Sequence, residues 1–300
     1  MAGPERTSID AELDPPYRVI EPRERTAPFV VCSPHSGRRY TRGFLDQSRL
    51  DPLTLRKSED FRVDDLFASA AEFGAPMIAA EFPRAYLDAN REPYELDPDL
   101  FDDVLPDYAN TQTVRVVGGL GTIARIVADG EEIYRVPLRL EDALERIERL
   151  YVPFHDRLTS LLEETRRLFG YAILIDCHSM PSSLTAQSGG PRPQFVLGDR
   201  FGHACDLRLT RYLREAIAAK GYDVQLNRPY AGGFITEHYG RPARGIHAIQ
   251  VEINRSLYMD EAKILPNAGF GKLQADLADI IARTFIDVPA LLEHRAAAAE

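Results

Sequence analysis

Residues 172–178 read Ala-Ile-Leu-Ile-Asp-Cys-His, four apolar residues followed at once by an acid, a thiol and an imidazole. A short continuous apolar run is typical of a strand buried on both faces of a sheet. A similar run occurs at 28–32, just before Ser-Pro-His-Ser-Gly at 33–37, and residues 248–253 form a largely apolar stretch that carries Glu252. The pattern predicts a sheet whose strands end in side chains capable of chemistry.

Helical patterns alternate with these strands. Apolar residues recur at helical spacing over 140–168, with Pro153 placed to kink the helix. Further helices are expected at 63–73, at about 206–219 and from 270 onward, and further strands at 77–82, 85–89 and 224–226. This alternation predicts an α/β fold with a largely parallel sheet covered by helices on both sides. We expect a single hydrolase domain over 26–290, after a loose lead-in over 1–25.

Composition narrows the function classes. The 300 residues are 44% hydrophobic and 27% charged, enough for a sizeable core. The formal net charge is −10 with no basic cluster, which argues against a nucleic-acid partner. No apolar window approaches the roughly 18 residues of a membrane span, and the first 16 residues lack a secretory pattern. Three cysteines without CxxC spacing argue against a disulfide framework, so we expect a cytoplasmic protein without a membrane partner.

Candidate chemical groups gather where ligand sites of open α/β sheets lie, at the carboxyl ends of strands. His35 and His178 follow two of the expected strands, Glu252 lies in a third, and the acidic pair Glu59 and Asp60 precedes a helix. Two histidines and a carboxylate holding zinc, beside a spare carboxylate, form a recurring hydrolytic arrangement. Each histidine alone is more often a core residue, and the acidic pair could instead stabilise a helix N-terminus.

Two acidic residues inside apolar strands leave alternatives open. Burying an unpaired carboxylate costs several kcal/mol, so Glu252 is either ion-paired, with Arg255 as a candidate, or used as a general base. Asp176 lies two residues before His178, so both side chains face the same way in an extended strand. Asp176 could then accept a hydrogen bond from that histidine, or it could instead bond to the loop at the end of the strand.

Two other functions fit the sequence less well. Gly119-x-Gly121-x-x-Ala124 mimics a dinucleotide-binding fingerprint, but Ala-Asp-Gly at 128–130 interrupts the helix it should open, which favours a substrate loop. A cysteine nucleophile is disfavoured. Cys177 is adjacent to His178 in a strand, so the two side chains point to opposite faces, and Cys32 lies in a buried apolar run where thiols are usually inert.

Six motifs occur in order between about residues 28 and 260. They are Ser-Pro-His-Ser-Gly (33–37), Ser-Glu-Asp-Phe (58–61), Tyr-Leu-Asp-Ala-Asn-Arg (86–91), Asp-Cys-His-Ser-Met (176–180), Gly-Gly-Phe-Ile-Thr-Glu-His-Tyr-Gly (232–240) and Ile-His-Ala-Ile-Gln-Val-Glu-Ile-Asn-Arg (246–255). Together they resemble the signatures of the N-formylglutamate amidohydrolase family. The resemblance implies a fold similar to the zinc exopeptidases, with a central mixed, mostly parallel sheet between helices. It also implies hydrolysis of N-formyl-L-glutamate to formate and L-glutamate.

The resemblance also implies roles for individual residues. His35, His178 and Asp60 would be the ligands of one divalent metal ion, with Glu59 the rival third ligand. Glu252 would be the general base. Two imidazoles and a carboxylate with an open fourth position suit zinc, although manganese, cobalt and iron stay open.

Substrate-binding residues follow from the same resemblance. Asn90-Arg91 is similar to the pair with which zinc carboxypeptidases hold a substrate carboxylate, a task that suits the planar guanidinium. Arg84 and Arg125 are further candidates or ordinary ion pairs. A glycine-containing loop is expected over 230–239, where Gly232 permits close backbone approach to a ligand. His238 and His247 are candidates to line the site.

One position departs from the family pattern. Some members carry an arginine where this chain has Glu237, so the substrate could be a different N-acyl amino acid or a small peptide. A non-catalytic amino-acid-binding protein on the same fold is the remaining alternative. In each case the expected partner is a small N-acyl amino acid or its product.

Overall fold

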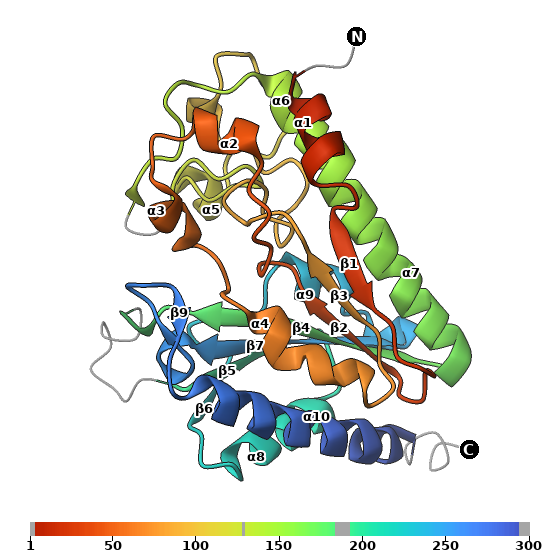
Figure 1. The fold of residues 1–300 in the computed structure, drawn as a ribbon. Helices are drawn as coiled ribbons and strands as arrows, with labels where there is room; N and C mark the ends of the chain where they lie inside the picture. Colours follow the sequence, from red (N-terminus) through yellow and green to blue (C-terminus); the bar gives the residue numbers. More distant parts are fainter. Residues whose placement is uncertain (1–3, 128–129, 184–192, 294–300) are drawn as a thin grey trace. The chain divides into compact units, whose positions relative to one another are not determined.

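The computed structural model describes residues 4–127, 130–183 and 193–293 and contains a seven-stranded sheet (Figure 1). In spatial order the strands are β1 (Tyr17–Ile20), β3 (Met77–Ala80), β2 (Phe29–Ser33), β4 (Ala172–Met180), β7 (Ile246–Asn254), β5 (Phe195–Gly198) and β6 (Val224–Leu226). Strands β2, β4 and β7 run parallel, whereas β5 is antiparallel to β7. The predicted α/β class with a mixed, mostly parallel sheet is confirmed.

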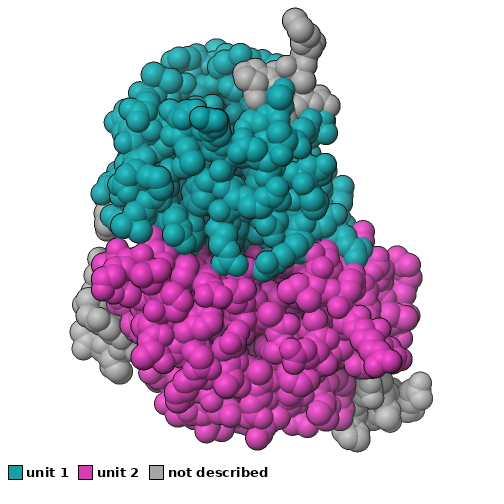
Figure 2. Space-filling view, in the orientation of Figure 1, with its two compact units in different colours: residues 1–18, 34–59, 79–158 teal, residues 19–33, 60–78, 159–300 magenta. Residues whose placement is uncertain are grey.

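The chain forms two compact units, coloured separately in Figure 2. Unit 1 comprises residues 1–18, 34–59 and 79–158, and unit 2 comprises residues 19–33, 60–78 and 159–300. Strands β2, β4, β5, β6 and β7 lie wholly in unit 2. Because the chain alternates between the units, the expected single domain over 26–290 stays a prediction.

In unit 2, three helices pack together against one face of the sheet (Figure 1). They are α4 (Val63–Phe67), which continues into the 3-10 turn η1 (Ala68–Ala71), α8 (Leu207–Ala218) and α10 (Phe270–Glu293). Alternate strand residues such as Ile175 and Val251 point into this core. Their neighbours Asp176 and Glu252 therefore lie on the opposite face, since successive side chains alternate along a strand.

Helix α9 (Phe234–Tyr239) contacts β4 and β7, and Thr236 bonds Asp176, which places α9 over that opposite face. The sequence predicted only a glycine-containing loop over 230–239. Six helical residues are too few to produce a hydrophobic period, so the pattern could not distinguish helix from loop. Elsewhere in unit 2 are the 3-10 turns η6 (Pro242–Arg244) and η7 (Arg255–Leu257) and the two-stranded sheet of β8 (Met259–Asp260) and β9 (Leu265–Pro266).

Unit 1 is mainly helices and long connections. Its helical elements are α1 (Pro4–Glu12), α2 (Arg42–Gln47), α3 (Pro52–Arg56), η2 (Pro98–Leu100), α5 (Val114–Val117), α6 (Leu140–Arg146), the π-turn η4 (Ile147–Tyr151) and the start of α7 (Val152–Phe169). The helix predicted over 140–168 is confirmed, with the π-turn directly before Pro153. No described helix is both long and apolar enough to span a membrane.

The N-terminal segment differs from the loose lead-in expected over 1–25. Helix α1 buries Glu5 and Ile9, and the following β1 joins the sheet. Arg146, fully buried, places Nε 2.5 Å from Oε1 of Glu5 and its guanidinium 4.1 Å from the ring centre of Tyr86. This ion pair joins residues far apart in the sequence, so no local pattern could reveal it.

One local prediction is wrong. Residues 85–89 do not form a strand, because the amides of Tyr86 and Leu87 both bond to the carbonyl of Pro83 and close a turn. Residues 114–117, which precede the fingerprint-like glycines, form helix α5, capped by Thr113. The dinucleotide pattern thus lacks its strand. Residues 128–129 of the predicted interruption lie outside the described residues.

Candidate active site

The register of β4 and β7 sets four polar side chains side by side. Asp176 pairs with Gln250, and His178 pairs with Glu252. Paired residues of parallel strands face the same side of the sheet, so all four lie on the face opposite α10. The apolar run ends at Ile175, but β4 continues to Met180. Asp176 and His178 are therefore fixed within a strand and not in a loop beyond it.

His178 is held at both ring nitrogens. Nε2 lies 2.9 Å from Oδ1 of Asp176, and Nδ1 lies 3.0 Å from Oδ2 of Asp60. Burial opposes protonation of His178, but the carboxylates of Asp176 and Asp60 outweigh it and raise its pKa well above the ordinary value. Asp60 also accepts hydrogen bonds from Ser179 and Arg255. The sheet therefore concentrates negative charge around one buried imidazole, an environment suited to a cation.

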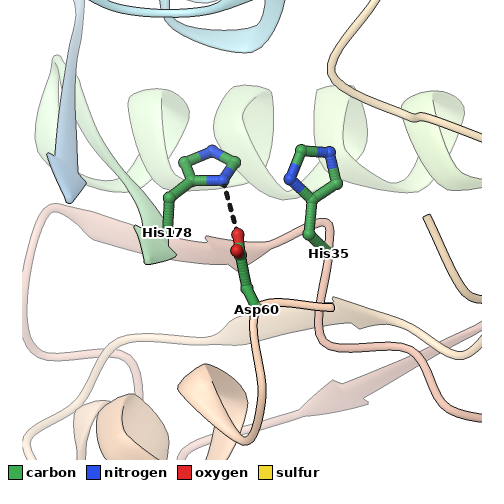
Figure 3. Close-up of side chains that lie close together, drawn as sticks. All are labelled: His35, Asp60 and His178. Carbon is green, nitrogen blue, oxygen red and sulfur yellow. Dashed lines mark hydrogen bonds and ion pairs between the residues drawn. The ribbon is translucent and has the colours of Figure 1, made fainter. Parts of the chain in front are cut away.

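Figure 3 draws His35, Asp60 and His178 together; one ligand atom from each lies within 4.8 Å of the others. In unit 1, Nε2 of His35 lies 2.7 Å from Oδ1 of Asp88. Both histidines therefore engage a carboxylate through Nε2 and would present Nδ1 to an ion. Paired carboxylate and imidazole groups of this kind orient the histidine ligands of metal sites. Two imidazoles and a carboxylate are a ligand set that zinc accepts, so the residues fit a metal.

The neighbouring acids Glu59 and Asp60 have different surroundings. Glu59, in unit 1, accepts a hydrogen bond of 2.8 Å from Tyr40 and two from Arg56, at 3.0 and 3.2 Å. Asp60 contacts His178 directly. Asp60, the first choice from the sequence, is thus among the side chains that could hold a metal ion, whereas Glu59 is in an ion pair with Arg56.

Glu252 is 6% exposed and accepts a hydrogen bond of 2.8 Å at Oε1 from Nε2 of Gln250. Arg255, which the sequence offered as an ion-pair partner for Glu252, donates from Nη2 to Asp60 at 3.2 Å and from Nε to Ser179 at 3.1 Å. Glu252 is thus a buried carboxylate beside His178, oriented by an amide.

Asp88 organises the expected carboxylate-binding residues in unit 1. It accepts hydrogen bonds from Nε of Arg84 at 3.0 Å and from the main-chain amide of Asn90 at 2.8 Å, and it lies 3.5 Å from Nη2 of Arg91. Burial would raise the pKa of Asp88, but Arg84 and Arg91 hold it well below the ordinary value. Arg91 also donates to the carbonyls of Leu120 and Asn90. Each of its three nitrogens therefore has a protein contact.

The other substrate-binding candidates, Arg125, Gly232 and His238, have contacts within the protein. Arg125 lies 2.7 Å from Asp97, in an ion pair of unit 1. Gly232 has φ +118°, and a Cβ built on Gly198 would lie 2.6 Å from the Gly232 nitrogen. The close approach expected at Gly232 is therefore between two backbone segments. His238 is part of α9 and stacks on a ring of the same helix.

The remaining sequence candidates lie away from this chemistry. His247 begins β7 at the end opposite Glu252, and its Nδ1 accepts the main-chain amide of Asp206. Cys32 and Cys177 are fully buried, and burial raises the pKa of both thiols well above the ordinary value. Neither thiol is poised as a nucleophile.

The sequence patterns did not point to three residues that contact the candidate groups. Asp88 belongs to the motif Tyr-Leu-Asp-Ala-Asn-Arg (86–91) and lies between Arg84 and Arg91 in the sequence. An acid between two arginines could have indicated an ion-pair group. Gln250 lies two residues before Glu252 on the same strand, so strand periodicity could have placed the two together. Thr236 donates to Oδ2 of Asp176 at 3.1 Å, a contact that no local pattern indicates.

The chain is similar to known proteins along most of its length. The family model for N-formylglutamate amidohydrolase matches residues 27–259. N-formylglutamate deformylases of Pseudomonas putida and Pseudomonas aeruginosa are 32% and 31% identical, over 82% and 81% of this chain and 87% and 86% of theirs. The crystal structure of N-formylglutamate amidohydrolase from Ralstonia eutropha JMP134 is 34% identical, with a TM-score of 0.86 over 93% of this chain and 99% of that chain.

The fold and the matches define an α/β enzyme of the amidohydrolase class. The chain belongs to the N-formylglutamate amidohydrolase family, and the resemblance carried by the six motifs is confirmed.

Proposed function

We propose that the chain hydrolyses the formyl amide of N-formyl-L-glutamate and releases formate and L-glutamate. Family membership and the names of the relatives support the substrate. The observation that carries the chemistry is the pairing of His178 with Glu252 on neighbouring strands. It places a buried carboxylate next to a candidate metal ligand, as amide hydrolysis requires.

His35, Asp60 and His178 would hold one divalent ion, and zinc fits this donor set best. When bound, such an ion supplies Lewis acidity and lowers the pKa of water to about 7. Asp88 and Asp176 orient the two imidazoles through their Nε2 atoms, which fixes the ring nitrogen that each would present to the ion.

Glu252 acts as the general base. It accepts a proton as a water oxygen attacks the formyl carbon, and it delivers that proton to the amine nitrogen when the carbon–nitrogen bond breaks. Formate then carries the water oxygen, and glutamate leaves with its amine. Positioned proton transfer of this kind typically contributes about 10² to 10⁴ in rate.

Asn90, Arg91 and Arg84 bind the substrate carboxylates. N-formylglutamate carries two carboxylates, whereas the protein has a net charge of −10, so attraction must be local. The side chain of Arg84 is 28% exposed and that of Arg91 only 8%. Arg84 is therefore the more accessible of the two, and Arg91 meets the ligand from a more buried position. The substrate is a small molecule, we expect cytoplasmic action, and neither nucleic acid nor membrane is required.

A second candidate substrate, another N-acyl amino acid, is favoured by one observation. Glu237 lies on α9 and pairs with Arg200 at 2.7 Å, where an arginine in some family members would carry the opposite charge. A substrate panel separates the two candidates, with N-formylglutamine, N-formylmethionine and N-acetylglutamate tested beside N-formylglutamate.

The test is formate release by purified, metal-loaded protein. We expect N-formylglutamate to be the best substrate, a chelator to abolish turnover, and zinc to restore it. An alkylating reagent should leave activity intact because Cys32 and Cys177 are buried. No formate release from N-formylglutamate would refute the proposal. Tight binding without turnover of any substrate would indicate a binding protein.

A further inference from the structure

Gln250 lies between the start of α9 and the proposed base. Its side chain is buried, with the residue 3% exposed. Oε1 accepts a hydrogen bond of 2.6 Å from the main-chain amide of Gly233, and Nε2 donates one of 2.8 Å to Oε1 of Glu252. An amide group has one accepting and one donating end. The Gly233 amide therefore fixes which end of Gln250 faces Glu252.

The position of Gly233 is itself determined by the backbone. Gly233 is the N-cap of α9 and follows Gly232, whose φ of +118° favours glycine. The same segment is tied to β5 because the Arg200 amide bonds the carbonyl of Ala231 at 2.8 Å, and Gly198 leaves no room for a side chain beneath it. A rigid support therefore holds the donor that orients Gln250.

Helix α9 makes a similar contact with β4. Thr236 donates to Asp176, which contacts His178, whereas Gly233 donates to Gln250, which contacts Glu252. Asp176 and Gln250 occupy paired positions on β4 and β7. Residues 233–236 thus contact two polar side chains at paired strand positions. One of these side chains contacts His178 and the other contacts Glu252.

We propose that Gln250 is a positioning residue that orients the Glu252 carboxylate. Gln250 is itself held by the main-chain amide of Gly233, the N-cap of α9. The inference rests on the proposed function, in which Glu252 is the base. The hydrogen bond of 2.8 Å to Oε1 restricts rotation of the Glu252 carboxylate.

A double-mutant cycle tests the proposal. Gln250→Leu removes both hydrogen bonds at similar size, and we expect kcat on N-formylglutamate to fall about 10- to 100-fold. KM should change less than about twofold and metal content should stay unchanged, because Gln250 binds neither substrate nor ion. Glu252→Gln should be slow by itself, and the double variant no slower than Glu252→Gln alone, since Gln250 acts only through Glu252. Multiplying effects would overturn the proposal.

Two further variants guard against a folding artefact. Gln250→Glu keeps an acceptor for Gly233 but cannot donate to Glu252, so we expect kcat to fall as in Gln250→Leu. Asn254→Leu is the matched control, because Asn254 is another buried amide on β7, with contacts to Pro193 and Ser256. It should keep kcat within about twofold, whatever its melting temperature. Parent-like kcat in Gln250→Glu would overturn the proposal.

A crystal structure of Gln250→Leu provides a readout that needs no turnover. We expect the Glu252 carboxylate to rotate away from its parent orientation. An unchanged carboxylate would overturn the inference. If the parent protein releases no formate, the proposed function fails, but this comparison still tests the role of Gln250.

Discussion

Nε2 of His178 lies 2.9 Å from a carboxylate oxygen of Asp176, two residues earlier on the same strand. In an extended strand, residues two apart face the same side, so the backbone alone brings this pair together. His35 reaches the same arrangement differently, since its partner Asp88 comes from a distant turn of unit 1. In both cases the carboxylate would hold a proton on Nε2 when Nδ1 coordinates an ion.

Asp176→Asn should weaken metal binding about 10- to 100-fold, because the neutral amide no longer fixes the His178 tautomer or raises its basicity. The dissociation constant for zinc, measured by competition with a chromogenic chelator, checks this. Thr236→Val is the matched control, since it removes one hydrogen bond to Asp176 and keeps the charge. Its effect on zinc affinity should be smaller. Equal affinities for Asp176→Asn and the parent would contradict the orienting role.

Asp60→Asn and Glu59→Gln should separate metal binding from stability. Asp60 contacts His178, so its loss should leave the purified protein largely metal-free. Glu59 bonds Tyr40 and Arg56, so Glu59→Gln should retain the metal and lower the melting temperature instead. Metal analysis and a thermal melt of each variant decide the question, and the reverse pattern would make Glu59 the ligand.

Lysine substitutions test the arginines near Asp88. Arg84→Lys and Arg91→Lys each keep the charge but lose the planar fork, so KM for N-formylglutamate should rise about tenfold or more with metal content unchanged. Arg125→Lys should leave KM near the parent value, because Arg125 pairs with Asp97. Unchanged KM in the first two variants would move the carboxylate site elsewhere. Arg115, whose charge contributes to the lowered pKa of Arg91, would be tested next.

The strands that carry the chemistry could be predicted because each is a short, largely apolar stretch, as at 28–32 and 248–253. The roles expected of His35, Asp60 and His178 followed from the family motifs and not from any local pattern. Contacts of the arginines could not be predicted. Whether Arg91 meets a substrate or a carbonyl depends on where the 118–122 loop lies, which is decided by tertiary packing.

The same reason explains the N-terminal segment and helix α9. Helix α1 is held by a buried pair between Glu5 and Arg146, so its order depends on a partner far along the chain. Helix α9 is held by contacts with two strands, from Thr236 to Asp176 of β4 and from its N-cap Gly233 to Gln250 of β7. Likeness to the zinc exopeptidases, implied by the family resemblance, stays a prediction.

Glu5→Gln should destabilise the protein by about 3 to 5 kcal/mol, because it leaves the buried charge of Arg146 uncompensated. Urea denaturation measures the free energy of unfolding. Asp10→Asn is the control, since Asp10 pairs with Arg149 at 4.0 Å with its side chain 53% exposed. An exposed pair is worth about 1 kcal/mol or less. Similar losses in the two variants would mean that α1 is held by other contacts.

Asp206 should make stability depend on pH through helix α8. Its hydrogen bonds with Arg208 hold the pKa of Asp206 at about 2. Because the folded-state pKa lies below the unfolded value of about 3.9, the stabilisation is complete above about pH 4 and is lost as the pH falls through about 2. Asp206→Ala should cost about 0.5 to 2 kcal/mol at pH 7 through loss of the helix cap, and less near pH 2. An equal cost at both pH values in urea denaturation would contradict this account.

The pairing of β4 with β2 and β7 has a consequence for how the enzyme is made. Phe29 pairs with Ile173, and Ala172 pairs with Ile246, so neither pairing can form between neighbours along a growing chain. Closing such loops is slow because their entropy is lost before the contacts form. A helix such as α10 can form early, but His178 and Glu252 meet only when the long-range register is complete. Catalytic competence is therefore expected late in folding, and a newly synthesised chain that lacks β7 can have native helices without an active site.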